Sequence, residues 1–203
     1  RPALDKDSPT APPVTNLLVW LRSDVGVEIS TNGRVTAWRD GSGLSNDFLG
    51  TALANMPVFS TEAMNGRGAV RFDGTNDFLK SAFVPSGEMT VLISRRYVAF
   101  RTNTTWSGLL CSRKTTAPCG GFMLAAYGSP APQDRLMLQT GCGSNWCSGI
   151  NFYNSYRLDL LPRTEIVRIG STNTEIWVDG ALIAQAPKGA IAPGTNLLLG
   201  AGS

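Results

Sequence analysis

The sequence contains no histidine and carries little charge. Over 203 residues the charged fraction is 16%, whereas globular proteins usually have about 25%. The lack of histidine excludes Ser-His-Asp and Cys-His nucleophilic sites in their usual forms, and it excludes histidine-based zinc sites. Any catalysis would therefore have to use carboxylates, lysine, tyrosine or a pair of cysteines.

Glutamates are also scarce, and their spacing matters for one class of enzyme. The chain has five: Glu28, Glu62, Glu88, Glu165 and Glu175. Jelly-roll glucanases carry an E-x-D-x-x-E strand, which places an acid and a nucleophile on one face. No glutamates stand at these spacings here, so we expect the protein not to be an enzyme.

Two classes of partner are disfavoured by what the sequence lacks. No apolar run approaches the roughly 18 residues of a membrane-spanning helix. The net charge is only +3, and Arg95 and Arg96 are the only adjacent arginines. Because a nucleic-acid binder normally has a basic stripe interleaved with aromatic residues, we expect no nucleic-acid partner and no membrane span.

All four cysteines lie in one stretch of the chain: Cys111, Cys119, Cys142 and Cys147. An even number of cysteines in a short segment predicts two local disulfides and an oxidising, extracellular compartment. The sequence does not choose among the pairings, but Cys111–Cys119 and Cys142–Cys147 are favoured because each closes a short loop. A four-cysteine zinc site is the alternative, although such sites usually space their pairs as C-x2-C.

The remaining pattern is one of short apolar runs separated by turns, in a chain with 22 Gly and 12 Pro. Residues 1–15 include four prolines and predict an extended leader or linker, and residues 16–203 predict one domain. Asp179-Gly180 predicts a tight hairpin turn. Because no helical stripe exceeds about two turns, we expect an all-β protein. The strand-like runs are residues 17–21, 34–38, 69–73, 77–83, 89–100, 108–112, 121–127, 135–140, 156–161, 165–170, 174–180 and 197–200.

Three segments, in order, resemble the laminin-G-like branch of the concanavalin-A-like jelly rolls. They are LVWLRSDVGV followed by GRVTAWRDGSGLSNDF (residues 18–48), NGRGAVRFDGTNDFL (residues 65–79) and EIVRIGSTNTEIWVDGALI (residues 165–183). The resemblance implies an antiparallel two-sheet jelly-roll sandwich. It leaves function open, because this fold is found in lectins, adhesion modules, glycosidases and structural proteins.

The C-terminal end departs from that family pattern. In similar domains the strand that corresponds to LLLG (residues 197–200) is followed by a loop and a closing strand, whereas this sequence ends at Ser203. We expect a domain that lacks its closing strand or receives it from elsewhere. An open sheet edge has unpaired N–H and C=O groups and favours pairing with another chain.

Two acidic turns are candidate calcium sites. Asp40 and Asp47 belong to one turn, and Asp73 and Asp77 belong to the other. Related folds use acidic loops to hold calcium, which takes six to eight oxygen ligands. The alternative, which we favour because neither loop has the spacing of a calcium hand, is that these residues form Asx turns. The expected cofactor is therefore none, or calcium.

Aromatic residues in polar segments are the candidate ligand contacts. Trp106 and Trp146 lie in Gly/Ser/Thr-rich stretches, with Tyr153 and Tyr156 close behind. Exposed rings stack on the apolar face of a sugar while neighbouring polar groups bond its hydroxyls. The alternative is that these rings pack over one end of the sandwich.

Three further tryptophans fall in apolar runs. Trp20 and Trp38 are expected in the core, whereas the face occupied by Trp177 is ambiguous because Ile176 and Val178 flank it.

The sequence thus predicts a secreted or surface-displayed module without catalytic activity. Its expected partner is carbohydrate or another surface ligand, bound by loops at one end of the sandwich. The alternative is a structural subunit of an extracellular filament, coat or viral particle, in which copies of the chain assemble by edge-strand pairing.

Overall fold

The computed structural model describes residues 15–100, 106–127, 134–141, 146–147, 156–187 and 191–200. Within these ranges the regular elements are β-strands, except for one short 3-10 helix, η1 (Leu53–Asn55), and no helix is long and apolar enough to cross a membrane. All strand pairs in these ranges are antiparallel, which confirms the predicted all-β class. The chain divides into two compact units, Arg1–Phe83 and Val84–Ser203, which are described separately.

The first unit contains a small sheet and a hairpin. The sheet has the order β1 (Val27–Ile29), β2 (Val35–Trp38), β3 (Phe48–Leu49) and β6 (Leu79–Ser81). The hairpin pairs β4 (Val58–Met64) with β5 (Arg67–Arg71). Alternation along β2 buries Val35 and Ala37, which with Phe48 and Leu79 form the apolar interior of this unit.

The predicted strand over residues 17–21 is wrong. Backbone groups of Trp20 bond to a turn instead of a neighbouring strand, because its N–H donates to Asp40 Oδ1 at 2.8 Å and its carbonyl accepts from Gly41 at 2.9 Å. Trp20 and Trp38 are partly exposed and not in the core. The Trp38 indole donates to the Arg22 carbonyl at 2.8 Å, and the Arg22 guanidinium lies 5.2 Å from the centre of the Trp20 ring.

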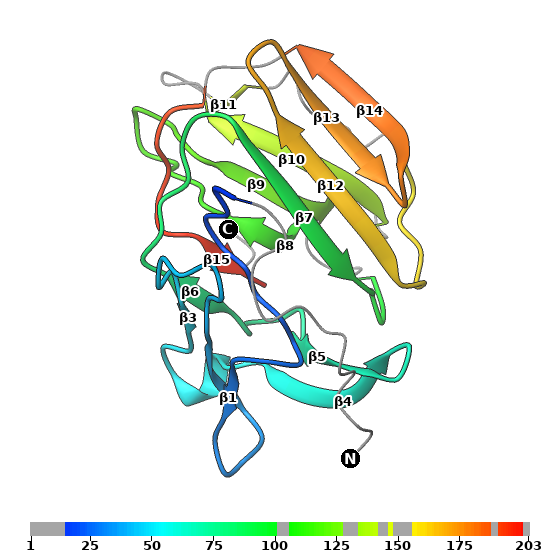
Figure 1. Cartoon of the computed structure of the whole chain (residues 1–203). Helices are drawn as coiled ribbons and strands as arrows, with labels where there is room; N and C mark the ends of the chain where they lie inside the picture. The colour runs from blue at the N-terminus through cyan, green and yellow to red at the C-terminus, as the bar shows by residue number, and fades with distance from the viewer. Residues whose placement is uncertain are drawn as a thin grey trace. The chain divides into compact units, whose positions relative to one another are not determined.

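The second unit contains two antiparallel sheets, which overlie one another in Figure 1. One sheet has the order β15 (Leu198–Leu199), β8 (Trp106–Cys111), β9 (Phe122–Tyr127), β10 (Arg135–Gly141) and β11 (Trp146–Cys147). The other has the order β14 (Ala181–Pro187), β13 (Asn173–Val178), β12 (Arg163–Ile169) and β7 (Met89–Arg95). Two stacked antiparallel sheets agree with the predicted jelly-roll sandwich.

The two sheets of this unit differ in how their faces are covered. In β9 five consecutive residues, Phe122–Ala126, are all buried, so neither face of this strand meets solvent. In β12 and β13 burial alternates, with Val167, Ile169, Ile176 and Val178 pointing inward. The β7–β12–β13–β14 sheet, in which burial alternates, therefore has one inward face and one face open to solvent.

The hairpin between β13 and β14 forms as predicted. Asp179 and Gly180 both have positive φ, at 48° and 83°, which is the combination that a type I′ turn requires. The register shifts at Ile176 and Trp177, so that Ile183 is the extra residue of a β-bulge in β14.

The run at residues 156–161, expected to be a strand, makes only an isolated bridge between Arg157 and Arg135.

Candidate binding face

The carboxylate of Asp40 closes its own turn. It accepts backbone N–H groups from Trp20, Ser42 and Asn46 at 2.8–3.0 Å. Desolvation pushes the pKa of Asp40 upward, but these bonds and one from the Ser42 hydroxyl outweigh it and lower the pKa. Asp47 accepts the Asp40 N–H at 2.8 Å, so the two residues fix the loop together.

The second acidic turn repeats this arrangement in fewer residues. Asp73 Oδ1 accepts the N–H groups of Thr75, Asn76 and Asp77 at 2.7–3.2 Å. Asp77 Oδ2 in turn accepts the Asp73 N–H at 3.0 Å. Burial, reinforced by the charge of Asp73, raises the pKa of Asp77, whereas amide bonds outweigh desolvation and lower the pKa of Asp73.

In both loops the aspartate carboxylates therefore accept backbone N–H groups and form the expected Asx turns. Within the part of the chain that the structure describes, no three His, Cys, Asp or Glu residues gather as a metal site would require. Calcium at Asp40, Asp47, Asp73 or Asp77 stays a prediction.

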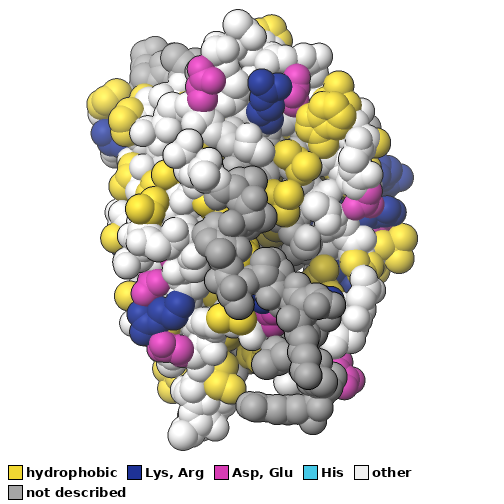
Figure 2. Space-filling view, viewed as in Figure 1, with side chains coloured by type: hydrophobic (Ala, Val, Ile, Leu, Met, Phe, Trp, Pro, Cys, Tyr) yellow, Lys and Arg dark blue, Asp and Glu magenta, His cyan; other side chains and the backbone are white. Residues whose placement is uncertain are grey.

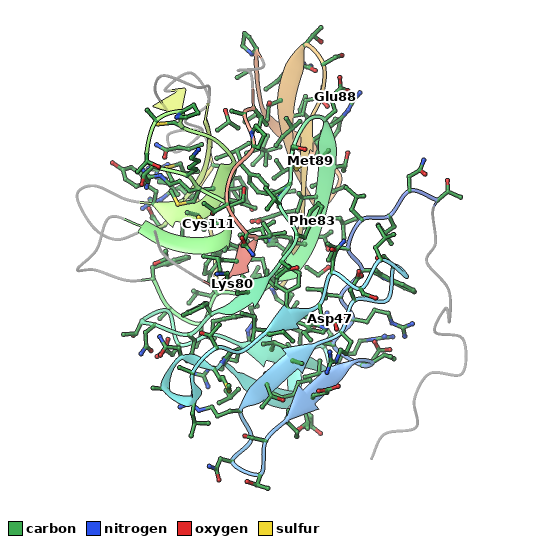
Figure 3. The ribbon with its side chains drawn as sticks, turned by 90° about the vertical axis from the view of Figure 1, so that its left-hand side faces the viewer. Asp47, Lys80, Phe83, Glu88, Met89 and Cys111 are labelled. Atoms are coloured by element: carbon green, nitrogen blue, oxygen red, sulfur yellow. The ribbon has the colours of Figure 1, made fainter. Side chains whose placement is uncertain are left out.

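The expected Cys111–Cys119 disulfide is not supported, since both cysteines are free and buried. Cys111, on β8 (Figure 3), packs among Met123, Ala125 and Met137, and burial raises its pKa. The Cys119 thiol instead donates to the Thr115 carbonyl at 3.6 Å. The position of Cys142 and the side chain of Cys147 lie outside the described residues.

The predicted aromatic contacts do not converge on one end of the sandwich. Trp106 begins β8 opposite Tyr127, and Trp146 belongs to β11 opposite Gly141, so neither backbone is in a loop. The two positions lie at opposite ends of β10, which is about 20 Å long. The side chains of both tryptophans, and all of Tyr153, lie outside the described residues.

Tyr156 is the one member of this set whose side chain is described. Its carbonyl accepts from Leu136 at 3.4 Å, which places it at the Trp106 end of β10. The side chain is half-buried, and burial raises its pKa, with Arg163 and Asp159 nearby. Arg163 is engaged by Asp159 at 3.1 Å and by Asp179 at 2.8 Å, so its charge is neutralised locally and is not offered to a ligand.

The clearest unpartnered surface is the outer face of the β7–β12–β13–β14 sheet. Register places Ile166 opposite both Leu92 and Trp177, and Trp177 opposite Leu182. These four side chains, here called the apolar row, therefore cross all four strands on one face. Leu92 is 65% exposed and Leu182 is 46% exposed, while Ile166 and Trp177 are partly exposed.

Polar residues border the apolar row on both sides. On one side Ser94 and Thr164 lie opposite each other, with their hydroxyl oxygens 3.2 Å apart. On the other side a row crosses the strands through Thr90, Arg168, Glu175 and Gln185. In Figure 2 hydrophobic side chains lie over this sheet at the upper right, with charged side chains beside them.

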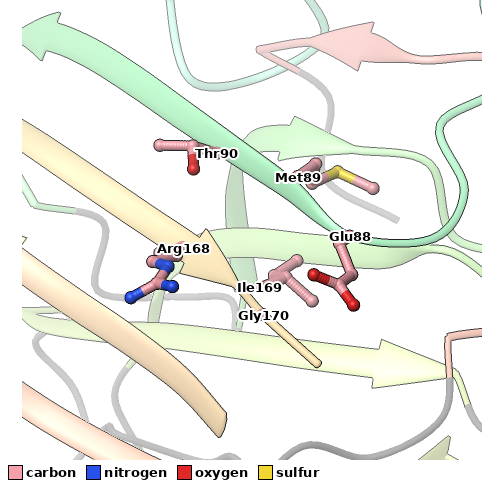
Figure 4. Close-up of a pocket in the computed structure, with 6 residues that line it drawn as sticks. All are labelled: Glu88, Met89, Thr90, Arg168, Ile169 and Gly170. Atoms are coloured by element: carbon pink, nitrogen blue, oxygen red, sulfur yellow. The ribbon is translucent and has the colours of Figure 1, made fainter. Parts of the chain in front are cut away.

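Two shallow hollows lie at the polar border. One, of about 240 Å³, is lined by Glu88, Thr90 and Arg168 together with Met89, Ile169 and Gly170 (Figure 4). The other, of about 340 Å³, is lined by Thr172, Asn173, Gln185, Ala186 and Pro187. Both carry hydrogen-bonding groups, and neither includes a member of the apolar row.

The sequence pattern did not assign Trp177 to this face. Three consecutive apolar residues, Ile176–Val178, leave the alternation undecided. The Asp179-Gly180 turn predicts that Trp177 lies opposite Leu182, since a two-residue loop fixes the register, but it does not tell which face of the hairpin meets solvent.

Comparison with known proteins adds little to this geometry. No family model and no curated protein matches the chain. Among solved structures, carbohydrate-binding module CBM66 from Bacillus subtilis superposes with a TM-score of 0.43 at 12% sequence identity, over 70% of this chain and 82% of that chain. At that level the likeness does not establish a family. The protein is thus defined by its own geometry, an antiparallel β sandwich with one solvent-facing apolar row.

Proposed function

We propose that the protein is a non-catalytic module that binds carbohydrate through the apolar row. The observation that carries this proposal is a partly exposed Trp177 between the partly exposed Ile166 and the exposed Leu182, bordered by hydroxyl, amide and charged groups. An indole ring packs on the C–H face of a sugar, and the neighbouring polar groups exchange hydrogen bonds with its hydroxyls.

The exposure of this row also supports a binding role. A soluble sheet face normally carries polar residues, because each apolar side chain left in water forgoes burial worth about 1.5–3 kcal/mol. An apolar patch rimmed by polar residues is typical of an interaction site. The row fits that description, with Ser94 and Thr164 on one side and Arg168 and Glu175 on the other.

The proposal that the module is non-catalytic rests on the chemistry of its side chains. The chain has no histidine and no closely spaced glutamate pair. Three of its five glutamates are engaged by arginines: Glu28 by Arg39, Glu165 by Arg95 and Glu175 by Arg168. The Arg39 guanidinium lowers the pKa of Glu28, because the cation favours the ionised carboxylate, so Glu28 is a poor general acid.

Membership of the laminin-G-like family and a secreted or surface location belong to the same proposal. They are supported by the three ordered sequence segments and by the sandwich fold. The described cysteines do not support an oxidising, extracellular location, since Cys111 and Cys119 are free.

Affinity electrophoresis and a glycan array of wild type and Trp177→Ala test the proposal. We expect wild type to bind at least one glycan and Trp177→Ala to bind it about tenfold more weakly, a loss of about 1.4 kcal/mol. Trp20→Ala, which removes a partly exposed indole from the first unit, is the matched control and should bind normally. Loss of binding in Trp146→Ala but not in Trp177→Ala would move the site away from the apolar row.

A structural subunit remains the second candidate, and one observation favours it. β7 pairs with β12 in unbroken register over seven residues, and no other described strand of the second unit pairs with its free edge. Its first six residues, Met89–Ser94, are uncharged, and uncharged regular edges favour pairing with another chain. β14 is less suitable, because the bulge at Ile183 and Pro187 both interrupt an edge. Sedimentation that shows only monomer at high concentration would contradict assembly.

A further inference from the structure

Building on the proposed function, we infer that the ligand of the apolar row is the flat surface of a neutral, extended polysaccharide. Single sugars and anionic glycans are expected not to bind there. The inference rests on three features of the face: the length of the apolar row, the charge of the face and the chemistry of its borders.

The first feature is the length of the apolar row. Its four residues come from four neighbouring strands and span three strand spacings, about 14 Å. The two hollows lie beside the row, at the ends of the strands, and do not undercut Trp177. A ligand on such a face is contacted from one side only, so the contact area grows with the length of the ligand and a single sugar ring gains little.

The second feature is the charge of the face. The chain as a whole is basic, with a net charge of +3, but the apolar row and its two borders hold one cation, Arg168, and the exposed Arg96 follows two residues after Ser94. Arg168 Nη1 lies 3.4 Å from Glu175 Oε2, and Glu88 lines the adjoining hollow. Sulfate and carboxylate groups are recognised by arginine or lysine side chains that have donors to spare. Here two carboxylates accompany one guanidinium, so an anionic polymer would be repelled at this border.

The third feature is the neutral hydrogen-bonding capacity of the borders. Ser94 and Thr164 supply hydroxyl groups on one side, and Thr90 and Gln185 supply a hydroxyl and an amide on the other. Residues of one strand that share a face are about 7 Å apart, so each border lies within one sugar width of the apolar row. Hydroxyls and amides both donate and accept, which suits the hydroxyl groups of neutral sugars.

Depletion from solution by insoluble polysaccharides tests the inference. Wild type is incubated with microcrystalline cellulose and with chitin powder, and separately run through gels that contain heparin or polygalacturonate. We expect retention on at least one neutral solid, no retardation by the anionic polymers, and no release by an excess of monosaccharide or disaccharide. Retention should be nearly independent of salt, because apolar contacts are not screened.

Two double variants connect retention to the face. Leu92→Ala with Leu182→Ala shortens the apolar row at both ends and should weaken retention at least fivefold. Leu160→Ala with Leu161→Ala removes two exposed leucines of the same unit outside the row and should leave retention unchanged.

The outcomes separate the inference from the proposed function. Binding to heparin or polygalacturonate that the row variants abolish, or complete release by a disaccharide, would overturn the inference and leave carbohydrate binding by the row intact. Row variants that alter binding to no glycan would overturn the proposed function as well.

Discussion

Arg95 and Glu165 form a buried ion pair that joins β7 to β12. The Arg95 Nε atom donates to Glu165 Oε1 at 2.8 Å, and the two side chains are 5% and 0% exposed. The guanidinium lies 4.6 Å from the centre of the Tyr97 ring. Among the described residues, Arg95 Nη1 and Glu165 Oε2 are buried and have no hydrogen-bond partner in the protein.

Removing one partner of this pair should be much more damaging than replacing both. Glu165→Ala leaves a buried guanidinium uncompensated and should cost about 3–5 kcal/mol of unfolding free energy, whereas Arg95→Met with Glu165→Leu should be close to neutral or stabilising. Urea denaturation at neutral pH measures both. A loss below about 1 kcal/mol in Glu165→Ala would mean that the pair is open to water.

The acidic turns should make the first unit sensitive to low pH. The pKa values of Asp40, Asp47 and Asp73 are lowered in the fold, for Asp47 mainly by Arg39. The folded state thus binds these protons less readily than the unfolded chain. Their stabilisation is present above the ordinary aspartate pKa of about 4 and is lost as pH falls through the lowered values.

Thermal melts between about pH 6 and pH 2 measure this loss of stability on acidification. Asp40→Asn should flatten the loss of stability on acidification. Asp77→Asn is the matched control, because burial raises the pKa of Asp77, so that its contribution is lost as pH rises instead. Removing Asp77 should therefore make the acid loss steeper, and equal slopes in the two variants would contradict the assignment.

Calcium should not change the stability of the protein. The carboxylates of Asp40 and Asp73 already accept three backbone N–H groups each. These hydrogen bonds compete with a metal ion for the same oxygen atoms. A ligand that binds only the folded state raises its stability with concentration. A melting temperature that rises saturably with calcium, and falls back with a chelator, would show that the loops bind the ion.

The hairpin of β13 and β14 illustrates what local sequence is able to predict. Asp179-Gly180 supplies the two positive φ values of a two-residue turn, and this turn sets the register of the strands that flank it. The pairing of Trp177 with Leu182 follows from that register, whereas Ile166 and Leu92 join the apolar row through the separate pairings of β12 with β13 and β7.

Features that depend on distant partners were not predictable in this way. Residues 17–21 have a strand-like composition, but the backbone of Trp20 is captured by Asp40, twenty positions away in the chain. Likewise the seven residues between Cys111 and Cys119 suggest a loop that a disulfide closes, whereas the strand pairing turns Cys111 toward Met123 and Met137. Spacing reports on chain length and not on the direction of a side chain.

The two described thiols should react slowly in the folded protein. Burial raises the pKa of Cys111, which lowers the thiolate fraction, and both cysteines are inaccessible. Labelling with a thiol reagent near pH 8, before and after unfolding and without reductant, measures this. We expect Cys111 and Cys119 to be labelled only after unfolding. Peptides still joined through Cys111 or Cys119 would instead restore the disulfide expected from the sequence.

Backbone packing around Ser112 gives the sharpest test of the second unit. The Ser112 carbonyl accepts the Thr195 N–H at 2.7 Å, and Gly121 N–H donates to the Ala192 carbonyl at 2.8 Å. A Cβ atom on Gly121 would lie 2.1 Å from the Ser112 carbonyl oxygen, and one on Gly194 would lie 2.0 Å from the same oxygen. Only glycine therefore allows the segment around Gly194 to cross the ends of β8 and β9.

Gly121→Ala and Gly87→Ala form a matched pair that separates packing from backbone strain. The two glycines have φ values of +74° and +73°, but a Cβ atom on Gly87 would meet nothing within 4 Å. Gly87→Ala should cost only the left-handed strain of about 1–2 kcal/mol, while Gly121→Ala adds a clash with rigid backbone and should cost more than about 4 kcal/mol. Chemical denaturation of both variants measures the difference, and equal losses would mean that the Ser112 carbonyl is free to move away.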